Sequence, residues 1–221
     1  MTEQTFTPAL GRVAPNRFYD PVVALTRERL WRALSAMHVA PQPEDVIVDV
    51  GCGTGSLALL LHRIEPRARI IGVDPDPDML ARARRKAAAT GARGGAAPQW
   101  HVGMGDALAP LLGAGSASTV VSSLVLHQCP LAVKRAILAS MAEVLRPGGR
   151  LVIADYGLQR TALMRLAFRT VQLADGRADT QPQAEGVLPG LIREAGFREV
   201  REAEVVPTAT GSISVYLARR D

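Results

Sequence analysis

The apolar residues of this chain follow two different periods in turn. Short runs typical of strands lie at 46–50, 69–74, 99–103, 118–123 and 150–156. The first, second and fifth have the apolar character of strands buried on both faces, whereas the third is weaker. Between them, apolar residues recur every three or four positions, as in helices with one buried face. Strands that alternate with helices predict a mostly parallel, doubly wound α/β sheet covered on both sides.

Four helices are predicted at about 21–37, 56–64, 76–90 and 130–145. The third has Asp76 in position to cap its start and Gly91 in position to end it. The expected inward residues of the other three are Val22, Leu25, Leu30, Leu34 and Met37; Leu57, Leu60, Leu61 and Ile64; and Val133, Ile137, Met141 and Val144.

The regular alternation of strands and helices ends after Tyr156. An extra helix is predicted at 158–175, then a polar stretch to Gln183, a helix at 184–195, and two strands at 197–206 and 213–218. Because only a short link joins these two strands, they must form a hairpin, so at least one of them runs antiparallel. We therefore expect an N-terminal lid or helical segment at 1–40 and a main domain at 41–221, with a substrate-cap insertion at about 158–183.

The first buried strand ends in an acid, Asp49, followed by glycines at 51, 53 and 55 and then by a helix. Glycines let the backbone turn sharply and approach a ligand closely. The free N–H groups at the start of the helix then face that ligand. This arrangement predicts a cradle for a cofactor.

The acids around the cradle indicate which cofactor it holds. A dinucleotide fingerprint requires a third glycine at position 56, where this chain has serine. Asp49 suits a ligand with a positive amino group. Asp74, at the tip of the second strand, can accept both hydroxyls of a ribose, and Asp106, after the third strand, can bind an exocyclic amine. Three such carboxylates favour S-adenosylmethionine over NAD.

With these motifs the chain resembles the class I S-adenosylmethionine-dependent methyltransferases from about Tyr19 to its C-terminus. The matching segments are 48–55 (VDVGCGTG), 72–75 (GVDP), 105–107 (GDA) and 145–149 (LRPGG). The resemblance implies a seven-stranded sheet whose last strand is inserted antiparallel, and S-adenosylhomocysteine as the product. The predicted cofactor-binding residues are Asp49, Gly51, Gly53, Gly55, Asp74, Pro75, Met79, Asp106, Ala107 and Ser123. Met79 is equally suited to packing on the adenine and to plain helix core.

The methyl acceptor should lie beyond the carboxyl ends of the strands. His127, after the fourth strand, is the candidate general base, because an imidazole with a near-neutral pKa suits proton abstraction. Its alternative role is a structural hydrogen bond at a helix start. Tyr19 and Tyr156 are candidate substrate contacts at the pocket rim, and each is equally compatible with plain packing.

The grouping of motifs resembles the branch that acts on small molecules, quinones and lipids, and no Asn-Pro-Pro-Tyr type motif follows the fourth strand. The apolar residues Leu163, Leu166, Phe168, Val171 and Leu173 can either cover an apolar substrate or form ordinary core. Two alternatives stay open: a nucleic-acid methyltransferase, and a non-catalytic binding or partner protein with the same fold.

Composition and charge indicate which classes of partner the chain is expected to lack. The net charge is +5, but the chain has only two lysines, and its basic run at 82–86 fits a solvated helix face, so no nucleic-acid partner is expected. Two cysteines and four unclustered histidines predict no metal site. No apolar run reaches the length of a membrane span, and the N-terminus does not resemble a signal peptide. We expect a cytoplasmic monomer or homodimer.

Overall fold

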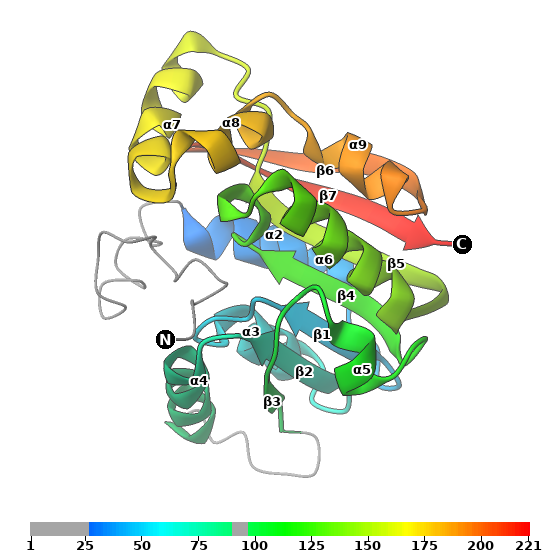
Figure 1. The fold of residues 1–221 in the computed structure, drawn as a ribbon. Coiled ribbons are helices and arrows are strands. Elements are labelled where there is room, and N and C mark those ends of the chain that lie inside the picture. Colours follow the sequence, from blue (N-terminus) through cyan, green and yellow to red (C-terminus); the bar gives the residue numbers. More distant parts are fainter. Residues whose placement is uncertain (1–26, 90–96) are drawn as a thin grey trace, which may run out of the picture.

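The computed structural model describes residues 27–89 and 97–221. Its centre is a seven-stranded sheet in the order β3-β2-β1-β4-β5-β7-β6 (Figure 1). The strands are β1 (Val46–Val50), β2 (Arg69–Asp74), β3 (Gln99–Val102), β4 (Ala117–Ser123), β5 (Leu145–Tyr156), β6 (Phe197–Thr208) and β7 (Gly211–Arg220). The first five strands are parallel, and β7 lies antiparallel between β5 and β6. The predicted fold and the inserted antiparallel strand are confirmed.

Helices cover both faces of this sheet (Figure 1). They are α2 (Glu28–Val39), α3 (Ser56–Ile64), α4 (Pro77–Ala89), α5 (Leu108–Leu112), α6 (Leu131–Val144), α7 (Ala162–Asp175), α8 (Arg177–Ala184) and α9 (Leu188–Glu194), with a 3₁₀ turn, η2 (Leu126–Gln128). The buried residues of α5, α6 and α9 share one apolar cluster, whereas those of α2, α3 and α7 share another.

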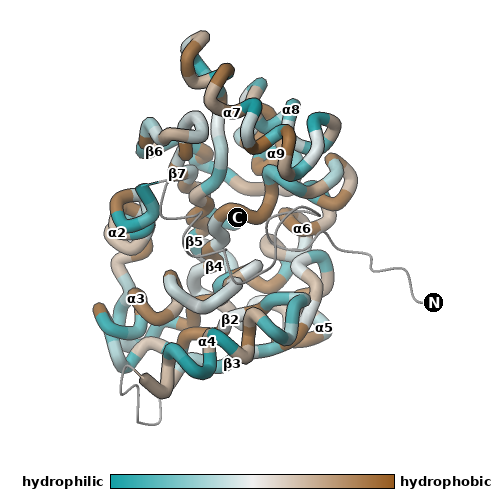
Figure 2. The backbone as a smooth tube through the Cα atoms, turned by 90° about the vertical axis from the view of Figure 1, so that its left-hand side faces the viewer, coloured by the Kyte–Doolittle hydropathy of each residue, from teal (hydrophilic) through white to brown (hydrophobic). Residues whose placement is uncertain are grey.

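The alternation of side chains along each strand separates the two clusters. In β1, Val48 and Val50 face the α6 side, while Ile47 faces the α3 side. Figure 2 shows the helices striped in hydrophilic and hydrophobic colours around the strands, as expected for elements that each bury one face. Because parallel strands are covered on both faces, their sequences are continuous apolar runs rather than alternating ones.

Helix α2 presents a different face to the core from the one predicted. Leu30 and Met37 are 40% and 57% exposed, whereas Trp31 and Ala36 are buried. The apolar residues of this helix can form more than one buried face. The face that contains Trp31 is the one that packs into the apolar cluster of the sheet. The predicted residues Val22 and Leu25 lie outside the described residues.

The buried face of helix α3 includes the predicted Leu57 and Leu61 but is wider than predicted and excludes Ile64. Ile64 is 52% exposed, and Ala58 and Leu59 are buried in addition to the predicted Leu57 and Leu61. Helix α3 is only nine residues long and its whole first turn lies against the sheet, so its buried surface is wider than one stripe. In α6, by contrast, the predicted Ile137, Met141 and Val144 are buried.

Several boundaries after residue 144 differ from those predicted, and three of the differences change an element's beginning or type. Strand β5 begins at Leu145, which pairs with Ala117, before an irregular segment and the main register at Arg150 opposite Thr119. The polar stretch before Gln183 is helical, as α8, despite an internal proline. The next helix begins only at Leu188. In the first two cases strand pairing and helix packing outweighed loop-forming residues, whereas in the third Gly186, with a φ of 83°, delays the start of the helix.

Helices α7 and α8 form the insertion between β5 and α9, which we call the cap. Phe168 and Val171 of α7 are buried in the sheet's apolar cluster. Leu163, Leu166 and Leu173 are 74%, 57% and 83% exposed. The apolar residues of the cap are thus divided between core and surface.

Over the described ranges, no helix combines the length and apolar character needed to cross a bilayer. In the same ranges, no three His, Cys, Asp or Glu side chains are grouped as metal ligands would be.

Candidate functional site

The loop between β1 and α3 is shaped by its glycines. Gly51, Gly53 and Gly55 have φ angles of 69°, 53° and 75°, a left-handed region that other residues rarely adopt. The N–H of Gly51 donates to the carbonyl of Val73 at 2.8 Å, which ties the loop to β2. A Cβ on Gly51 would lie 2.2 Å from Cγ2 of Val125, so the loop after β4 approaches the glycine loop directly.

Asp49, at the end of β1, is a fully buried carboxylate. Among the described residues, neither of its oxygens has a hydrogen-bond partner of normal distance and angle, and only the backbone N–H of Ala58 interacts weakly with the carboxylate. Burial raises the pKa of Asp49 to about 7; Arg32 opposes this effect, and Asp74 adds to it. A buried carboxylate without donors is costly, and a ligand's ammonium group would satisfy it. Asp49 and the glycine loop therefore fit a cofactor that carries a cationic amine.

Asp74 ends the neighbouring strand, β2, but its oxygens are already engaged. Oδ2 accepts from the N–H of Gly53 at 2.8 Å, and Oδ1 accepts from the N–H of Asp76 at 2.9 Å. Burial raises the pKa of Asp74, and these two hydrogen bonds oppose the shift. Each oxygen retains a further lone pair, so Asp74 can hold the glycine loop and still accept from ribose hydroxyls.

The other predicted cofactor residues lie at the carboxyl edge of the sheet or next to it. Pro75 follows β2, Met79 is buried in α4, and Ser123 ends β4 half-buried. Asp106 and Ala107 follow β3 and are exposed. Asp76 caps α4 as predicted, accepting from the N–H of Asp78 at 2.8 Å. The strand order reverses between β1 and β4, which is where ligands bind in open α/β sheets.

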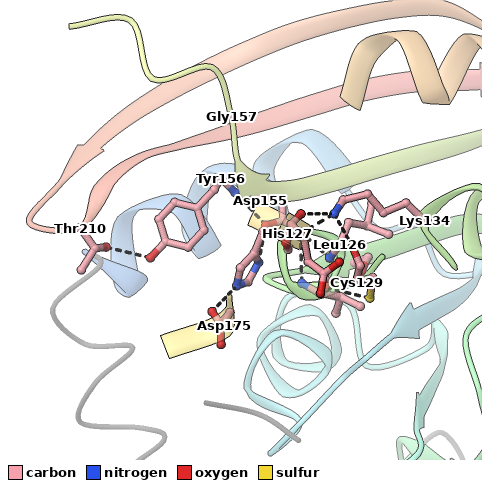
Figure 3. A network of polar contacts seen from close by, with 12 residues as sticks. Leu126, His127, Cys129, Lys134, Asp155, Tyr156, Gly157, Asp175 and Thr210 are labelled. Carbon is pink, nitrogen blue, oxygen red and sulfur yellow. Dashed lines mark hydrogen bonds and ion pairs between the residues drawn. The ribbon is translucent and has the colours of Figure 1, made fainter. Parts of the chain in front are cut away.

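His127 lies in a network of buried charges (Figure 3). Its Nδ1 is 2.7 Å from Oδ1 of Asp155, and its Nε2 is 3.4 Å from Oδ2 of Asp175. Burial alone would lower the pKa of His127, but the two carboxylates outweigh it and raise the pKa to about 9.

An imidazole protonated at neutral pH has no lone pair with which to take a proton. The geometry therefore does not support His127 as a free general base. It agrees with the alternative of a structural hydrogen bond beside a helix start.

Asp155 organises the turn that carries His127. Its Oδ2 accepts from the N–H groups of Val125, Leu126 and His127 at 3.2, 2.7 and 3.3 Å. These bonds hold a turn in which Leu124 adopts a strained φ of 55°. The sequence analysis predicted no role for Asp155, although, like Asp49 and Asp74, it is an acid at the end of a strand. Asp175 has no comparable sequence signal.

Tyr156 is packed rather than presented to a ligand. It is 5% exposed, its ring lies 5.0 Å from His127 and 5.1 Å from Phe168, and its hydroxyl is 2.8 Å from Oγ1 of Thr210. Burial raises its pKa to about 12. Of the two roles predicted for Tyr156, the structure thus favours packing. Tyr19 lies outside the described residues.

Lys134, on α6, joins the cap to the same turn. Its side chain is fully buried and donates to the carbonyls of Cys129 and, at 2.7 Å, Asp179 of α8. The carbonyl of His127 accepts from the same ammonium at 3.4 Å. Sequence reasoning missed this residue, because an isolated lysine on an amphipathic helix is usually solvated.

Comparison with known proteins agrees with this geometry. Residues 47–149 match the family model of a methyltransferase domain. The chain is 32% identical over 185 residues to the malonyl-[acyl-carrier protein] O-methyltransferase of Methylococcus capsulatus, covering 83% of this chain and 62% of that protein. It is 25% identical over 235 residues to the ubiquinone/menaquinone biosynthesis C-methyltransferase of Syntrophotalea carbinolica, covering 96% and 93%.

A solved structure shares the fold. The magnesium protoporphyrin IX methyltransferase of Synechocystis, with bound S-adenosylmethionine, aligns with a TM-score of 0.66 at 20% identity, covering 97% of this chain and 88% of that one. The chain spans only 57% and 62% of the length of two of the curated relatives that it matches.

Proposed function

The chain belongs to the class I S-adenosylmethionine-dependent methyltransferases, and from this premise we propose that it transfers a methyl group to an O, N or C atom of a small-molecule or lipid-like acceptor. The observation that carries the proposal is the buried, unpartnered carboxylate of Asp49 beside the glycine loop. That carboxylate is matched to the amino group of S-adenosylmethionine.

The remaining contacts follow from the positions of the side chains. Asp49 and Gly51 would hold the methionine part, Asp74 the ribose, and Asp106 with Ala107 the adenine. Met79 and Pro75 would line the adenine side, with Gly53, Gly55 and Ser123 completing the cradle. The cofactor supplies a methyl group on a sulfonium leaving group, so the main task of the chain is to position the acceptor.

The acceptor class is proposed from the relatives. Their names include enzymes of quinone biosynthesis and of malonyl-acyl carrier protein, which are small or carrier-bound acceptors. We propose residues 41–221 as the methyltransferase domain, with 158–183 as a substrate cap and 1–40 as a lid. A cytoplasmic location and a monomeric or homodimeric state belong to the same proposal.

Calorimetry with S-adenosylhomocysteine tests the cofactor site. Asp49→Asn should weaken binding by about 10- to 100-fold, because a charge-assisted hydrogen bond of ~1.5–3 kcal/mol is lost. Asp78→Asn, which removes a carboxylate from the exposed first turn of α4, is the matched control and should bind like the wild type. Equal binding by Asp49→Asn and the wild type would remove Asp49 from the site.

A labelled-methyl assay tests the reaction. The wild type should label at least one member of a panel of hydroquinones, phenols, amines and lipids. Cofactor binding without transfer to any of them would instead favour a non-catalytic binding protein. Transfer to RNA or DNA alone, with a steep dependence on salt, would favour the nucleic-acid alternative.

A further inference from the structure

Asp175, the last residue of α7, carries an unused hydrogen-bond acceptor. Its side chain is 9% exposed, and Oδ2 faces Nε2 of His127 at 3.4 Å. Its other oxygen, Oδ1, has no hydrogen-bond partner within the described part of the chain. Buried acceptors are almost always satisfied, so an unsatisfied one indicates a missing partner.

The contacts of the network show where a partner is missing. His127 lies between the carboxylates of Asp155 and Asp175, and the buried ammonium of Lys134 lies on the Asp155 side of the network, where it donates to backbone carbonyls. The oxygens of Asp155 are occupied by His127 and by four backbone N–H groups. The unmet demand for a donor therefore falls on Asp175.

The network also lies next to the cofactor site. His127 belongs to the turn after β4, and Val125 of the same turn lies directly against Gly51. The cap thus places a buried carboxylate against the turn that contacts the loop proposed to hold the methyl donor. Figure 3 shows Asp175 reaching His127 from the side opposite Lys134.

We propose that Oδ1 of Asp175 binds the O–H or N–H group of the methyl acceptor and selects hydroxyl or amine acceptors over carboxylates. The inference rests on the proposed methyltransferase function. His127 is then a positioning residue, whose ring fixes one oxygen of Asp175 and leaves the other free. A carboxylate acceptor has no proton to donate and would place a second anionic oxygen against Oδ1 of Asp175 in a buried site, which is unfavourable.

The test uses two matched aromatic probes, 1-naphthol and 1-naphthoate, added to protein saturated with S-adenosylhomocysteine. Calorimetry measures their affinities directly, so the readout does not depend on turnover. The wild type should bind 1-naphthol at least 10-fold more tightly than 1-naphthoate. In Asp175→Asn the amide oxygen should accept from His127, so the NH₂ group would face the acceptor and the preference should collapse or reverse.

Two further variants separate binding from folding. Asp175→Glu keeps the carboxylate and should retain the preference for 1-naphthol. Glu185→Gln removes the same charge from an exposed position of the cap and should behave like the wild type. If Asp175→Asn does not fold, the wild type and Asp175→Glu still test the proposal. A preference for 1-naphthol in both proteins would support it, and loss of the preference in Asp175→Glu would count against it.

Two results would overturn the assignment: equal or tighter binding of 1-naphthoate by the wild type, or an unchanged preference in Asp175→Asn. Failure of the wild type to bind either probe would also count against it. In each of these cases the assignment of Asp175 fails, but binding of S-adenosylhomocysteine by the wild type would still support the proposed function. Loss of that binding would defeat the proposed function itself.

Discussion

At the scale of the residue, three buried acids at strand ends have different roles because they have different partners. Asp49 has no donor of normal hydrogen-bond geometry among the described residues, Asp74 accepts from two backbone N–H groups, and Asp155 accepts from four and from His127. An acid whose hydrogen bonds are filled by the chain stabilises a loop. One without partners among those residues is available to a ligand.

The stability contribution of His127 should depend on pH. Its pKa rises from 6.5 to about 9 on folding, so this contribution is fully present below about pH 6.5 and is lost as the pH rises through 9. A shift of that size corresponds to about 3 kcal/mol. Urea unfolding of the wild type and His127→Gln should therefore show a large difference at pH 6.5 and a much smaller one at pH 10. A difference in the free energy of unfolding that does not change with pH would contradict the ion pairs of His127 with Asp155 and Asp175.

Gly55→Ala should destabilise the fold by about 2–4 kcal/mol, from backbone strain and overpacking together. Gly55 has a φ of 75°, and a Cβ there would lie 2.5 Å from Cη2 of Trp100 and 2.9 Å from Cβ of Ala83. Gly148→Ala is the matched control, since its φ is 72° but no described atom lies within 4 Å of its Cβ position. It should cost only about 1 kcal/mol. Equal losses in urea unfolding would exclude the packing argument.

At the scale of the element, the cap is held to the sheet by a few buried contacts that link distant segments. Phe168 of α7 packs on Tyr156 of β5, and Lys134 of α6 donates to the carbonyl of Asp179 in α8. Gln159, at the root of the cap, donates to the carbonyl of Ser212 and accepts from its N–H. The cap is therefore docked by apolar packing of α7 and by buried hydrogen bonds of Lys134 and Gln159.

Lys134→Met should loosen α8, because three carbonyls lose a shared charged donor. We expect a loss of about 2–4 kcal/mol in stability and faster hydrogen exchange of the α8 amides than of the β4 amides. Arg135→Met, at the next position of α6, removes a half-exposed charge paired with Glu194 and should have little effect. Unchanged exchange in α8 would show that Lys134 does not hold the cap.

At the scale of the whole molecule, the residues proposed to bind the cofactor lie at the carboxyl edge of five parallel strands, and the cap and the turn after β4 are the segments proposed for the acceptor side. A ligand that binds this edge only in the folded state must raise the free energy of unfolding. The glycine loop, α4 and the turn after β4 would share that stabilisation.

S-adenosylhomocysteine at about 100 times its Kd should stabilise the wild type by about 2.7 kcal/mol. For a chain of this size that corresponds to a rise of roughly 5–11 °C in Tm. At the same concentration Asp49→Asn should show a much smaller rise, whereas Asp78→Asn should match the wild type. Equal rises in all three, measured by scanning calorimetry, would place the ligand elsewhere.

The local sequence determined the elements and the class of cofactor site. Runs of valine and isoleucine ending in Asp49 and Asp74 define β1 and β2, and Gly51, Gly53 and Gly55 define the loop, because strand burial and positive φ each demand particular residue types. The antiparallel pairing of β6 with β7 also followed, because a short link requires a hairpin, while the insertion of β7 beside β5 followed only from the family resemblance.

Only the tertiary structure decided the partners of His127 in the turn after β4. The pairing of His127 with Asp175 joins residues 48 positions apart through a helix whose docking no local pattern encodes. The same is true of the buried face of α2 and of Lys134, whose environments depend on which distant segments pack against them. Periodicity identifies a face that can be buried, but the charge state and partners of a side chain depend on the neighbours that the fold brings to it.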